Sequence, residues 1–229
     1  MKKKAIVLSL GGSLIIPNEI NLGFLKKFKK VILKHTKKYK FLIVCGGGSI
    51  ARKYISALKK AGLSSEFQSF SGISATRMNA RFMNYFFGIN PDQGIPHTTK
   101  TMEIYANKRD VLFFGALEYK PKQTSDSTAA EVANHFKTIF INLTNVPGLY
   151  SKNPLEHKDA KFIPEISWKA FNKLANSMNY KPGQHFVLDQ TASWIIMKHK
   201  IPTYILGDDL NQLEAVLNKK KFKGTIIQG

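Results

Sequence analysis

Three consecutive glycines followed by an arginine are the residues whose types and spacing point most directly to chemistry. Gly46, Gly47 and Gly48 end an apolar run typical of a buried strand, and Arg52 lies one turn into the helical pattern that follows. Glycines leave backbone N–H groups uncovered, and at a helix N-terminus the helix dipole favours an anion there. Arg52 adds a forked cation that suits phosphate oxygens. The pattern indicates a phosphate site, although a sharp strand-to-helix corner explains the glycines about equally well.

A second glycine turn lies near the start of the chain. Gly11, Gly12 and Ser13 directly follow a strand-like run over residues 4–10. Ligands of open α/β sheets bind at the carboxyl ends of the strands, so we expect the two turns at one edge of one sheet. Neither turn has the spacing GxxxxGK[ST] of a phosphate loop or the complete dinucleotide spacing GxGxxG. The phosphate prediction therefore needs support from other residues.

Strand-like and helix-like segments alternate, which indicates one α/β domain over residues 1–229 with a mostly parallel sheet and helices on its faces. The expected strands are 4–10, 42–45, 111–115, 138–144, 202–206 and 224–227. The expected helices are 24–33, 51–58, 72–85, 128–136, 188–197 and 209–217. Residues 102–106 are too short to classify, 117–127 read as a polar loop, and 145–154 read as a turn.

Polar residues at three of these helices have a structural and a functional interpretation. Asp126 or Ser127 is placed to cap the helix 128–136, a role as probable as contact with a ligand, and Asp189 is placed to cap the helix 188–197. In the helix 72–85 the residues Thr76, Arg77 and Asn79 face either a ligand or water.

The chain carries 35 basic and 15 acidic residues, a formal charge of +20 that attracts polyanions. Many lysines lie between residues 26 and 40, on a helix expected to turn Phe24, Leu25, Phe28, Val31, Ile32 and Leu33 to the core. A solvated helix face is the simpler explanation, and no RNA-binding or zinc-finger spacing is present, so nucleic acid is not the expected main ligand.

Composition sets further expectations. There is no apolar run of eighteen residues and no signal-peptide pattern, so we expect a soluble cytoplasmic protein. Cys45 is the single cysteine and lies in an expected buried strand, so we interpret it as a packing residue and assign it no chemical role. No His/Cys or carboxylate cluster is dense enough to form a protein metal site.

Six segments together resemble the archaeal-type uridylate (UMP) kinases of the amino acid kinase superfamily. They are GGSL at 11–14, GGGSIARKYI at 46–55, GISATRMNA at 72–80, TSD at 124–126, LTNVPGLY at 143–150 and the closing GTII. The order matches over nearly the whole chain. The resemblance implies a three-layer α/β/α sandwich, usually a hexamer, that transfers the γ-phosphoryl group of ATP to UMP with Mg²⁺ brought by ATP. It implies an acceptor-binding part at about 1–135 and an ATP-binding part at about 136–229.

The resemblance also implies roles for single residues. Arg52 and Asp126 would be catalytic, with Arg52 also at the transferring phosphates. The residues implied to bind ATP are Gly12, Ser13, Gly48, Arg52, Thr144, Asn145, Tyr150 and Asn153. The residues implied to bind UMP are Gly47, Ser69, Thr76, Thr124 and Ser125.

The sequence departs from the family pattern at several of these positions. Ser69 replaces an aspartate, Pro147 and Asn153 replace aspartates on the ATP side, and Ser9 stands where many superfamily members have a catalytic lysine that the archaeal UMP kinases also lack. Lys120 or Lys122 is a possible substitute cation. Two alternatives therefore stay open: a kinase of the same fold with another small phosphate or carboxylate acceptor, and a nucleotide-binding regulatory protein without turnover.

Overall fold

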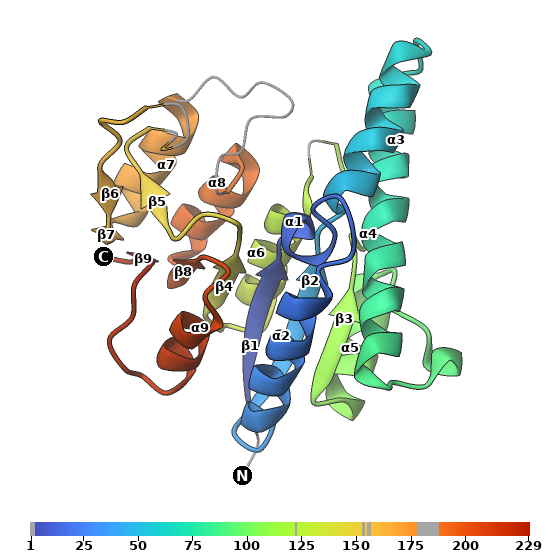
Figure 1. The fold of residues 1–229 in the computed structure, drawn as a ribbon, viewed down its shortest axis with the longest axis horizontal. Coiled ribbons are helices and arrows are strands. Elements are labelled where there is room, and N and C mark those ends of the chain that lie inside the picture. Colours follow the sequence, from blue (N-terminus) through green and yellow to red (C-terminus); the bar gives the residue numbers. More distant parts are fainter. Residues whose placement is uncertain (1–2, 122, 153, 155–156, 178–187) are drawn as a thin grey trace.

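A seven-stranded sheet forms the centre of the molecule, with strand order β3-β2-β1-β4-β8-β9-β7 (Figure 1). The computed structural model describes residues 3–121, 123–152, 154, 157–177 and 188–229. The strands are β1 (Lys4–Leu10), β2 (Tyr39–Cys45), β3 (Val111–Phe114), β4 (Phe140–Leu143), β7 (Glu165–Ile166), β8 (Thr203–Leu206) and β9 (Thr225–Ile227). A separate antiparallel pair is formed by β5 (Leu149–Tyr150) and β6 (Phe162–Ile163).

The helices alternate with these strands. They are α1 (Gly12–Ile15), α2 (Leu22–His35), α3 (Gly48–Lys60), α4 (Ser65–Phe87), α5 (Thr99–Lys108), α6 (Ser125–His135), α7 (Trp168–Ser177), α8 (Gln190–His199) and α9 (Leu210–Leu217), with a short 3₁₀ turn, η1, at Pro91–Gln93.

All neighbouring strands of the large sheet run parallel except β8 and β9. The chain leaves β1 toward β2 on one side, and β4 pairs with β1 on the other. The strand order therefore reverses between β1 and β4, which is where open α/β sheets bind ligands. The predicted mostly parallel α/β sheet is confirmed.

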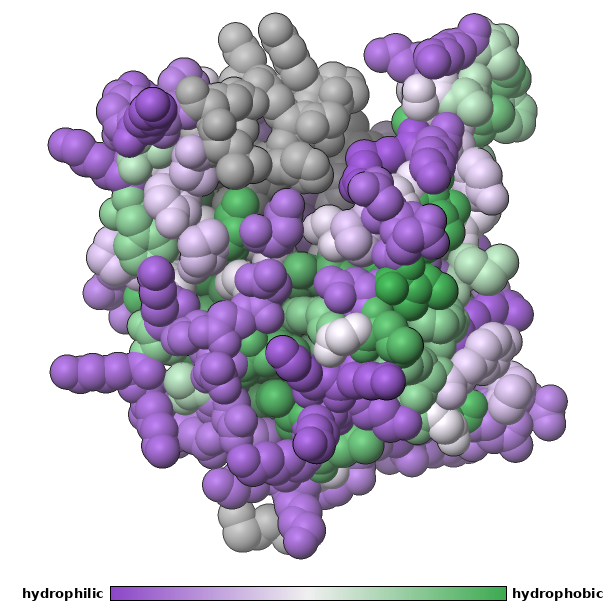
Figure 2. Space-filling model, viewed as in Figure 1, coloured by the Kyte–Doolittle hydropathy of each residue, from purple (hydrophilic) through white to green (hydrophobic). Residues whose placement is uncertain are grey.

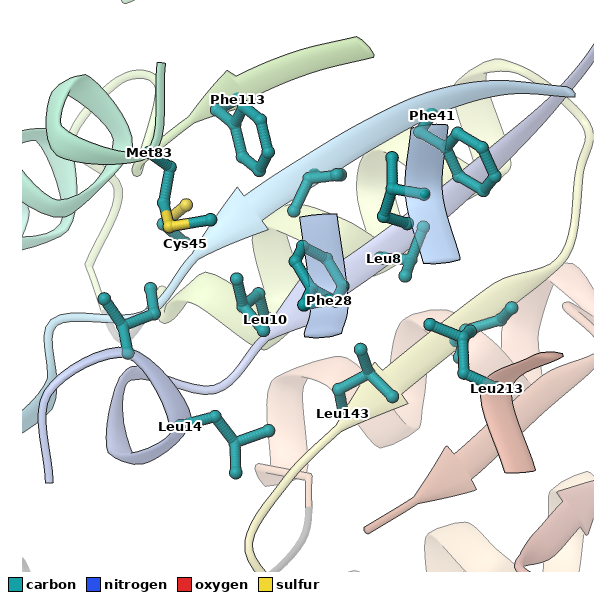
Figure 3. Packing of buried hydrophobic residues seen from close by; sticks show 14 of the residues in the cluster. Leu8, Leu10, Leu14, Phe28, Phe41, Cys45, Met83, Phe113, Leu143 and Leu213 are labelled. Carbon is teal, nitrogen blue, oxygen red and sulfur yellow. The ribbon is translucent and has the colours of Figure 1, made fainter. Parts of the chain in front are cut away.

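Apolar side chains alternate between the two faces of the sheet and build a core on each. On β1, Leu8 and Leu10 pack with α1, α2, α4 and α9, whereas Val7 packs with α5, α6, α7 and α8. Figure 3 shows the first of these cores, with Phe28 of α2 lying over Leu10 and Leu8. Helices thus cover both faces, which confirms the three-layer sandwich.

The structure corrects several expected boundaries. The helix expected at 72–85 begins earlier, at Ser65, because its first two turns expose Phe67 and Phe70 and so lack an inward apolar pattern. The unclassified segment 102–106 belongs to α5, and the turn expected at 145–154 contains strand β5.

The lysine-rich helix α2 is amphipathic as expected, with one exception. Phe24, Leu25, Phe28 and Ile32 are buried and Val31 is partly buried, but Leu33 is 45% exposed, so its predicted core position is wrong. The side of the molecule that carries α2 is largely hydrophilic (Figure 2). Within the described ranges, no helix is long and apolar enough to cross a membrane.

Candidate phosphate-binding site

The two glycine turns meet at the end of the sheet. A Cβ atom built on Gly12 would lie 2.0 Å from the backbone nitrogen of Gly48, and one built on Gly46 would lie 2.4 Å from the nitrogen of Gly12. Gly48 has φ +63°, a left-handed conformation that favours glycine. Glycine is therefore required here for backbone contact between two neighbouring strand ends, which is more than a single sharp corner needs.

Hydrogen bonds tie the two turns to each other and to β4. The Gly46 N–H donates to Leu10 O at 2.9 Å, and the Gly11 N–H donates to Leu143 O at 2.9 Å. The N–H of Ser49, in the first turn of α3, donates to Ile16 O at 3.1 Å. The carboxyl ends of β1, β2 and β4 thus form one rigid edge, with Ser13 and Gly47 half-buried on it.

Helix α4 supports the second glycine turn from the side. Asn79, which is buried, donates from Nδ2 to Gly46 O at 2.7 Å. Thr76 accepts the Ala116 N–H at Oγ1 at 3.0 Å, and its methyl group would lie 3.6 Å from a Cβ on Gly47. Arg77 donates from Nε to Ala116 O at 3.0 Å and from its terminal nitrogen to Leu117 O. These three side chains hold loops in place; Thr76 and Asn79 are buried and Arg77 is half-buried.

Arg52 lies on the exposed side of α3, where one terminal nitrogen is 3.4 Å from Pro17 O. It lines a hollow of about 470 Å³ together with Ser49, Lys53 and Lys60. The Ser49 hydroxyl is buried and has no hydrogen-bond partner among the described residues. A buried hydroxyl and three cations around this hollow, which begins at the glycine turn and extends along α3, favour an anionic ligand.

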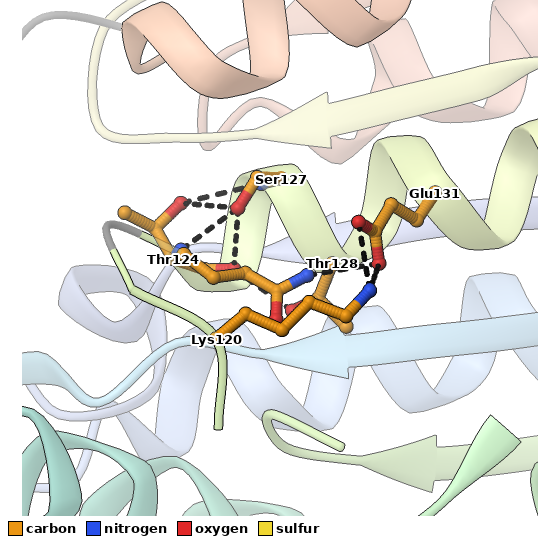
Figure 4. A network of polar contacts seen from close by, with 6 residues as sticks. Lys120, Thr124, Ser127, Thr128 and Glu131 are labelled. Atoms are coloured by element: carbon orange, nitrogen blue, oxygen red, sulfur yellow. Dashed lines mark hydrogen bonds and ion pairs between the residues drawn. The ribbon is translucent and has the colours of Figure 1, made fainter. Parts of the chain in front are cut away.

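Thr124 caps α6, a role that the sequence analysis gave to Asp126 or Ser127. Its Oγ1 accepts the N–H groups of Asp126 at 3.1 Å and Ser127 at 3.2 Å, and Ser127 Oγ accepts the Thr124 N–H at 2.8 Å. Figure 4 shows this reciprocal capping box. The helix consequently begins at Ser125 rather than at residue 128. Residues 124–127 are all of types that can cap a helix, so the sequence does not show which of them does. The backbone geometry of the structure shows that it is Thr124.

The loop before this cap is held by an ion pair. Lys120 donates to both carboxylate oxygens of Glu131, at 3.0 and 2.8 Å, and Gln123 donates to the same carboxylate (Figure 4). Lys120 is thus paired along α6, and Lys122 lies outside the described residues.

Asp126 lies in a small polar cluster beneath the glycine turns. Ser9 of β1 donates from Oγ to Asp126 Oδ1 at 2.7 Å. Burial of the carboxyl group, and then the nearby Asp189 carboxylate, raise the pKa of Asp126 to about 7, while the Ser9 hydrogen bond opposes this. Asp189 accepts the Ala192 N–H at 2.9 Å, which confirms its predicted cap of α8, and also accepts a hydrogen bond from Thr124 Oγ1.

The sequence analysis missed this pair of carboxylates. Asp189 received only a capping role because its partner lies 63 residues away along the chain, and no local pattern joins the two. Ser9 was noted only as the residue at a lysine position. Among the described residues no group of three or more His, Cys, Asp or Glu forms a metal cage. Two neighbouring carboxylates, of which Asp189 helps to raise the pKa of Asp126, nevertheless suit a Mg²⁺ ion that arrives with phosphate ligands.

The residues expected around ATP lie beyond β4. The Thr144 N–H donates to Leu206 O at 2.9 Å, and Thr144 Oγ1 donates to Asn145 Oδ1 at 3.3 Å. Tyr150 packs edge-on against Phe162 with ring centroids 5.3 Å apart. Thr144 thus lies beside the first glycine turn, Tyr150 lies on the small β5–β6 sheet, and Asn153 lies outside the described residues.

Ser69 is not brought to the glycine turns. It is exposed and donates to Ser65 O at 2.8 Å. It precedes Thr76 by seven residues, which is about 10 Å along α4. A hollow of about 580 Å³ between α2 and α9 also lies apart from the turns and is lined by both lysines and carboxylates.

Comparison with known proteins is consistent with this geometry. Residues 4–207 match the model of the amino acid kinase family. This chain belongs to that family.

Within the amino acid kinase family, uridylate kinases are similar to this chain over nearly its full length. The uridylate kinase of Thermoplasma volcanium is 34% identical over 228 residues, covering 98% of each chain. That of Archaeoglobus fulgidus is 34% identical and covers 97% of this chain and 99% of its own. The crystal structure of the Archaeoglobus fulgidus uridylate kinase superposes with a TM-score of 0.82 at 30% identity over 97% of this chain. The expected resemblance to archaeal uridylate kinases is confirmed over nearly the full length.

Proposed function

We propose that this chain transfers the γ-phosphoryl group of ATP to UMP and releases ADP and UDP. One structural observation carries the proposal: two glycine turns meet by backbone contact at the ends of β1 and β2, next to the β1–β4 boundary where the strand order reverses and beside an arginine-lined hollow. The uridylate kinases of Thermoplasma volcanium and Archaeoglobus fulgidus align with the chain over nearly its full length, and they supply the identity of the acceptor.

In the proposed reaction an oxygen of the UMP phosphate attacks the γ-phosphorus of ATP, and the bond from that phosphorus to the β–γ bridging oxygen breaks. The acceptor phosphate is already anionic, so no general base is required, and the protein's task is positioning and charge neutralisation. Gly12, Ser13 and Gly48 would contact the ATP phosphates, and Gly47 would contact the UMP phosphate. Arg52 would neutralise charge on the group in transfer.

We propose that UMP, the acceptor, and ATP, the donor, bind on opposite sides of the carboxyl end of β1. On the acceptor side the proposal places Thr76, Thr124 and Ser125, and on the donor side Thr144, Asn145, Tyr150 and Asn153. Thr76 and Thr124 already make backbone and side-chain hydrogen bonds, so they would shape the site as well as contact the ligand. Ser69 belongs to this proposal only if the acceptor extends along α4.

Mg²⁺ would enter with ATP and screen the charge of its phosphates. Asp126 and Asp189 are the residues that would hold it, because the two carboxylates are close enough for Asp189 to raise the pKa of Asp126, and Ser9 ties Asp126 to the end of β1 just before the first glycine turn. Ser9 would keep Asp126 oriented. We further propose an acceptor part at about 1–135, an ATP part at about 136–229, and a homo-oligomer, as the family resemblance implies.

The test follows the transferred group itself. ATP labelled in its γ-phosphoryl group is incubated with the protein, Mg²⁺ and UMP, and the nucleotides are separated. The label should appear in UDP and should remain in ATP when UMP is left out. Label that passes only to water would contradict the proposal.

A further inference from the structure

Basic residues gather at the edge of the sheet opposite the glycine turns. The parallel strands β1, β2, β3, β4 and β8 begin at this amino edge, and α9 ends beside it, where the Tyr39 hydroxyl at the start of β2 donates to Leu217 O at 2.9 Å. Hydrophilic side chains cover the lower end of the molecule (Figure 2), where Figure 1 shows the starts of β1, β2 and β3.

We call the described segments that lead into these strands, or leave α9, the amino-edge connections: residues 3, 36–38, 109–110, 136–139, 200–202 and 218–221. They share an excess of cations, namely Lys3, Lys37, Lys38, Arg109, Lys137, Lys200, Lys219, Lys220 and Lys221. Their acidic residue is Asp110, which pairs with Lys3 at 2.5 Å. The amino edge is therefore strongly positive.

The carboxyl edge, where the glycine turns lie, has the opposite charge balance. The described connections that leave the same strands contain the acidic residues Glu118, Asp208 and Asp209, and their basic residue, Lys120, is paired with Glu131. ATP and UMP are anions, so a positive charge that served only these substrates would be concentrated at the carboxyl edge. Much of the formal charge of +20 lies instead at the amino edge, where it is available to another anion.

Three lysines at the amino edge have a backbone conformation that lysine disfavours. Lys137, Lys200 and Lys219 have φ angles of 49°, 51° and 56°, and every other described residue with positive φ is a glycine. They lie at the C-terminal ends of α6, α8 and α9, where a left-handed residue is usually glycine or asparagine. All three are exposed, and none forms an ion pair with a described residue. Lysine therefore costs stability at three points of one edge and adds unpaired charge at each.

Two of these lysines lie at one level of the sheet. Lys137 and Lys200 stand three residues before Phe140 and Thr203, which are partners in the neighbouring strands β4 and β8. The cations thus form a row along the strand starts, as an extended polyanion requires.

We propose that the amino edge binds the phosphate backbone of double-stranded nucleic acid without reading its sequence. The cations lie at the starts of five neighbouring strands, β3, β2, β1, β4 and β8, which span about 19 Å at about 4.8 Å per strand. Phosphates follow one another about every 3.4 Å along each strand of a duplex, so on the order of five can be contacted over that distance. This ligand binds away from the proposed kinase site and does not depend on it.

The amino-edge connections favour a duplex over a single strand or a membrane. Single-stranded nucleic acid is held by stacking on exposed aromatic rings, and proteins of the membrane surface insert exposed apolar side chains. The aromatic and large apolar residues of these connections, Phe136, Ile139 and Ile201, pack instead against the two cores. No RNA-binding or zinc-finger spacing is present in the sequence, which agrees with a contact that reads no bases. The contact is thus made by lysines and phosphates alone.

The first test is the salt dependence of binding to short labelled DNA and RNA duplexes, measured by fluorescence anisotropy. The logarithm of the native association constant should fall with the logarithm of the salt concentration with a slope of about −4.5. The triple variant Lys137→Gly, Lys200→Gly, Lys219→Gly should bind about a hundredfold more weakly at about 0.1 M salt, with a slope of about −2. Glycine favours positive φ, so this variant should melt no lower than the native chain and its loss of binding cannot come from unfolding.

A matched variant removes the same charge elsewhere. Lys158, Lys169 and Lys173 are exposed, and the last two lie on α7, far from the start of β1 (Figure 1). Replacing all three by alanine should leave the salt slope at the native value. An equal loss of binding in both triple variants would show that only net charge matters and would overturn the proposal, as would a native chain that binds no duplex. Tighter binding to single strands, or to vesicles of anionic lipid, would overturn it as well.

A second test locates the bound duplex on the molecule. Mg-ATP is added in excess to the chain–duplex complex while the ionic strength is held constant. The anisotropy should not change, because the nucleotide belongs at the carboxyl edge and the duplex at the amino edge. Displacement of the duplex by Mg-ATP would place the duplex at the glycine turns and contradict the proposal.

Discussion

The Ser9 hydroxyl donates a 2.7 Å hydrogen bond to Oδ1 of Asp126, and this bond joins the end of β1 to the first turn of α6. Ser9 is fully buried, so its position is set by the sheet and not by solvent. The carboxyl group is therefore held at a defined place below the glycine turns. Its pKa, about 7, makes its charge sensitive to pH in the range where enzymes are assayed.

Replacing Ser9 by alanine should raise the pKa of Asp126, because the hydrogen bond from Ser9 favours the ionised form. If turnover requires the ionised carboxylate, the acid limb of the pH–rate profile should move to higher pH by about half a unit or more. Ser193→Ala removes another buried hydroxyl, on α8, and is the matched control. An unchanged acid limb in Ser9→Ala would separate Asp126 from the chemistry.

Asp126→Asn should slow transfer yet stabilise the fold at high pH. Because the folded-state pKa is raised, the folded chain binds more protons than the unfolded chain between about pH 4 and 7, and it loses stability as pH rises through that window. If the carboxyl group has a pKa of about 7 in the folded chain and 3.8 in the unfolded chain, ionising it lowers the free energy of unfolding by at most about 4 kcal/mol. The cap of α6 is untouched because Thr124 forms it.

Urea unfolding at pH 5 and pH 8 measures this effect. The free energy of unfolding of Asp126→Asn, relative to the native chain, should be higher at pH 8 by about 2 kcal/mol or more. Asp92→Asn, which removes an exposed carboxyl group from the 3₁₀ turn η1, is the matched control. A difference for Asp126→Asn that does not change with pH would show that the carboxyl is not buried as described.

Gly12→Ala should destabilise the fold and not merely weaken phosphate binding. The added Cβ would meet the Gly48 backbone at 2.0 Å, and neither strand end can move without breaking the sheet edge. We expect a loss of about 3 kcal/mol or more in the free energy of unfolding. Gly23→Ala on α2 meets no atom within 4 Å and should raise stability by about 0.5–1 kcal/mol. Equal unfolding midpoints for the two variants would contradict the contact between the turns.

Arg52→Ala should lower kcat/KM by about a hundredfold while leaving the fold intact. The side chain is exposed and makes a single long hydrogen bond to Pro17 O, so stability should change by less than about 0.5 kcal/mol. Loss of one charge-stabilising donor typically costs 10²–10³ in rate, as an order of magnitude. Lys53→Ala, the exposed neighbour in the same hollow, should have a much smaller effect. Comparable losses of kcat/KM in both variants would mean that Arg52 contributes only to the positive electrostatic potential of the hollow and makes no specific contact with the transferring group.

The sequence was sufficient for six of the seven strands of the large sheet and for the meeting of the glycine turns, but it missed the two-residue strand β7. The apolar runs of β1 and β2 end at Leu10 and Cys45, and each is followed at once by glycine, so both turns could be placed at strand ends. Periodicity failed where helix faces are exposed: it missed the start of α4 at Ser65 because Phe67 points outward, and it placed Leu33 in the core.

Local sequence patterns could not predict the polar cluster of Ser9, Asp126 and Asp189. The capping of α6 depends on backbone geometry that distinguishes Thr124 from its neighbours, and the approach of Asp189 to Asp126 depends on the packing of α8 against α6. Family resemblance named Asp126 as a catalytic residue, but only the three-dimensional structure reveals its burial and its neighbours: burial and Asp189 raise its pKa, and the Ser9 hydrogen bond opposes them.

The most direct test of the proposed activity is the initial rate of ADP release from Mg-ATP with UMP, CMP, dUMP, AMP, GMP and small carboxylates as acceptors. ATP binding is titrated on the same sample. We expect UMP to stimulate release far more than any other acceptor. ATP binding without stimulation by UMP, whether another acceptor works or none does, would contradict the assignment of this chain as a UMP kinase.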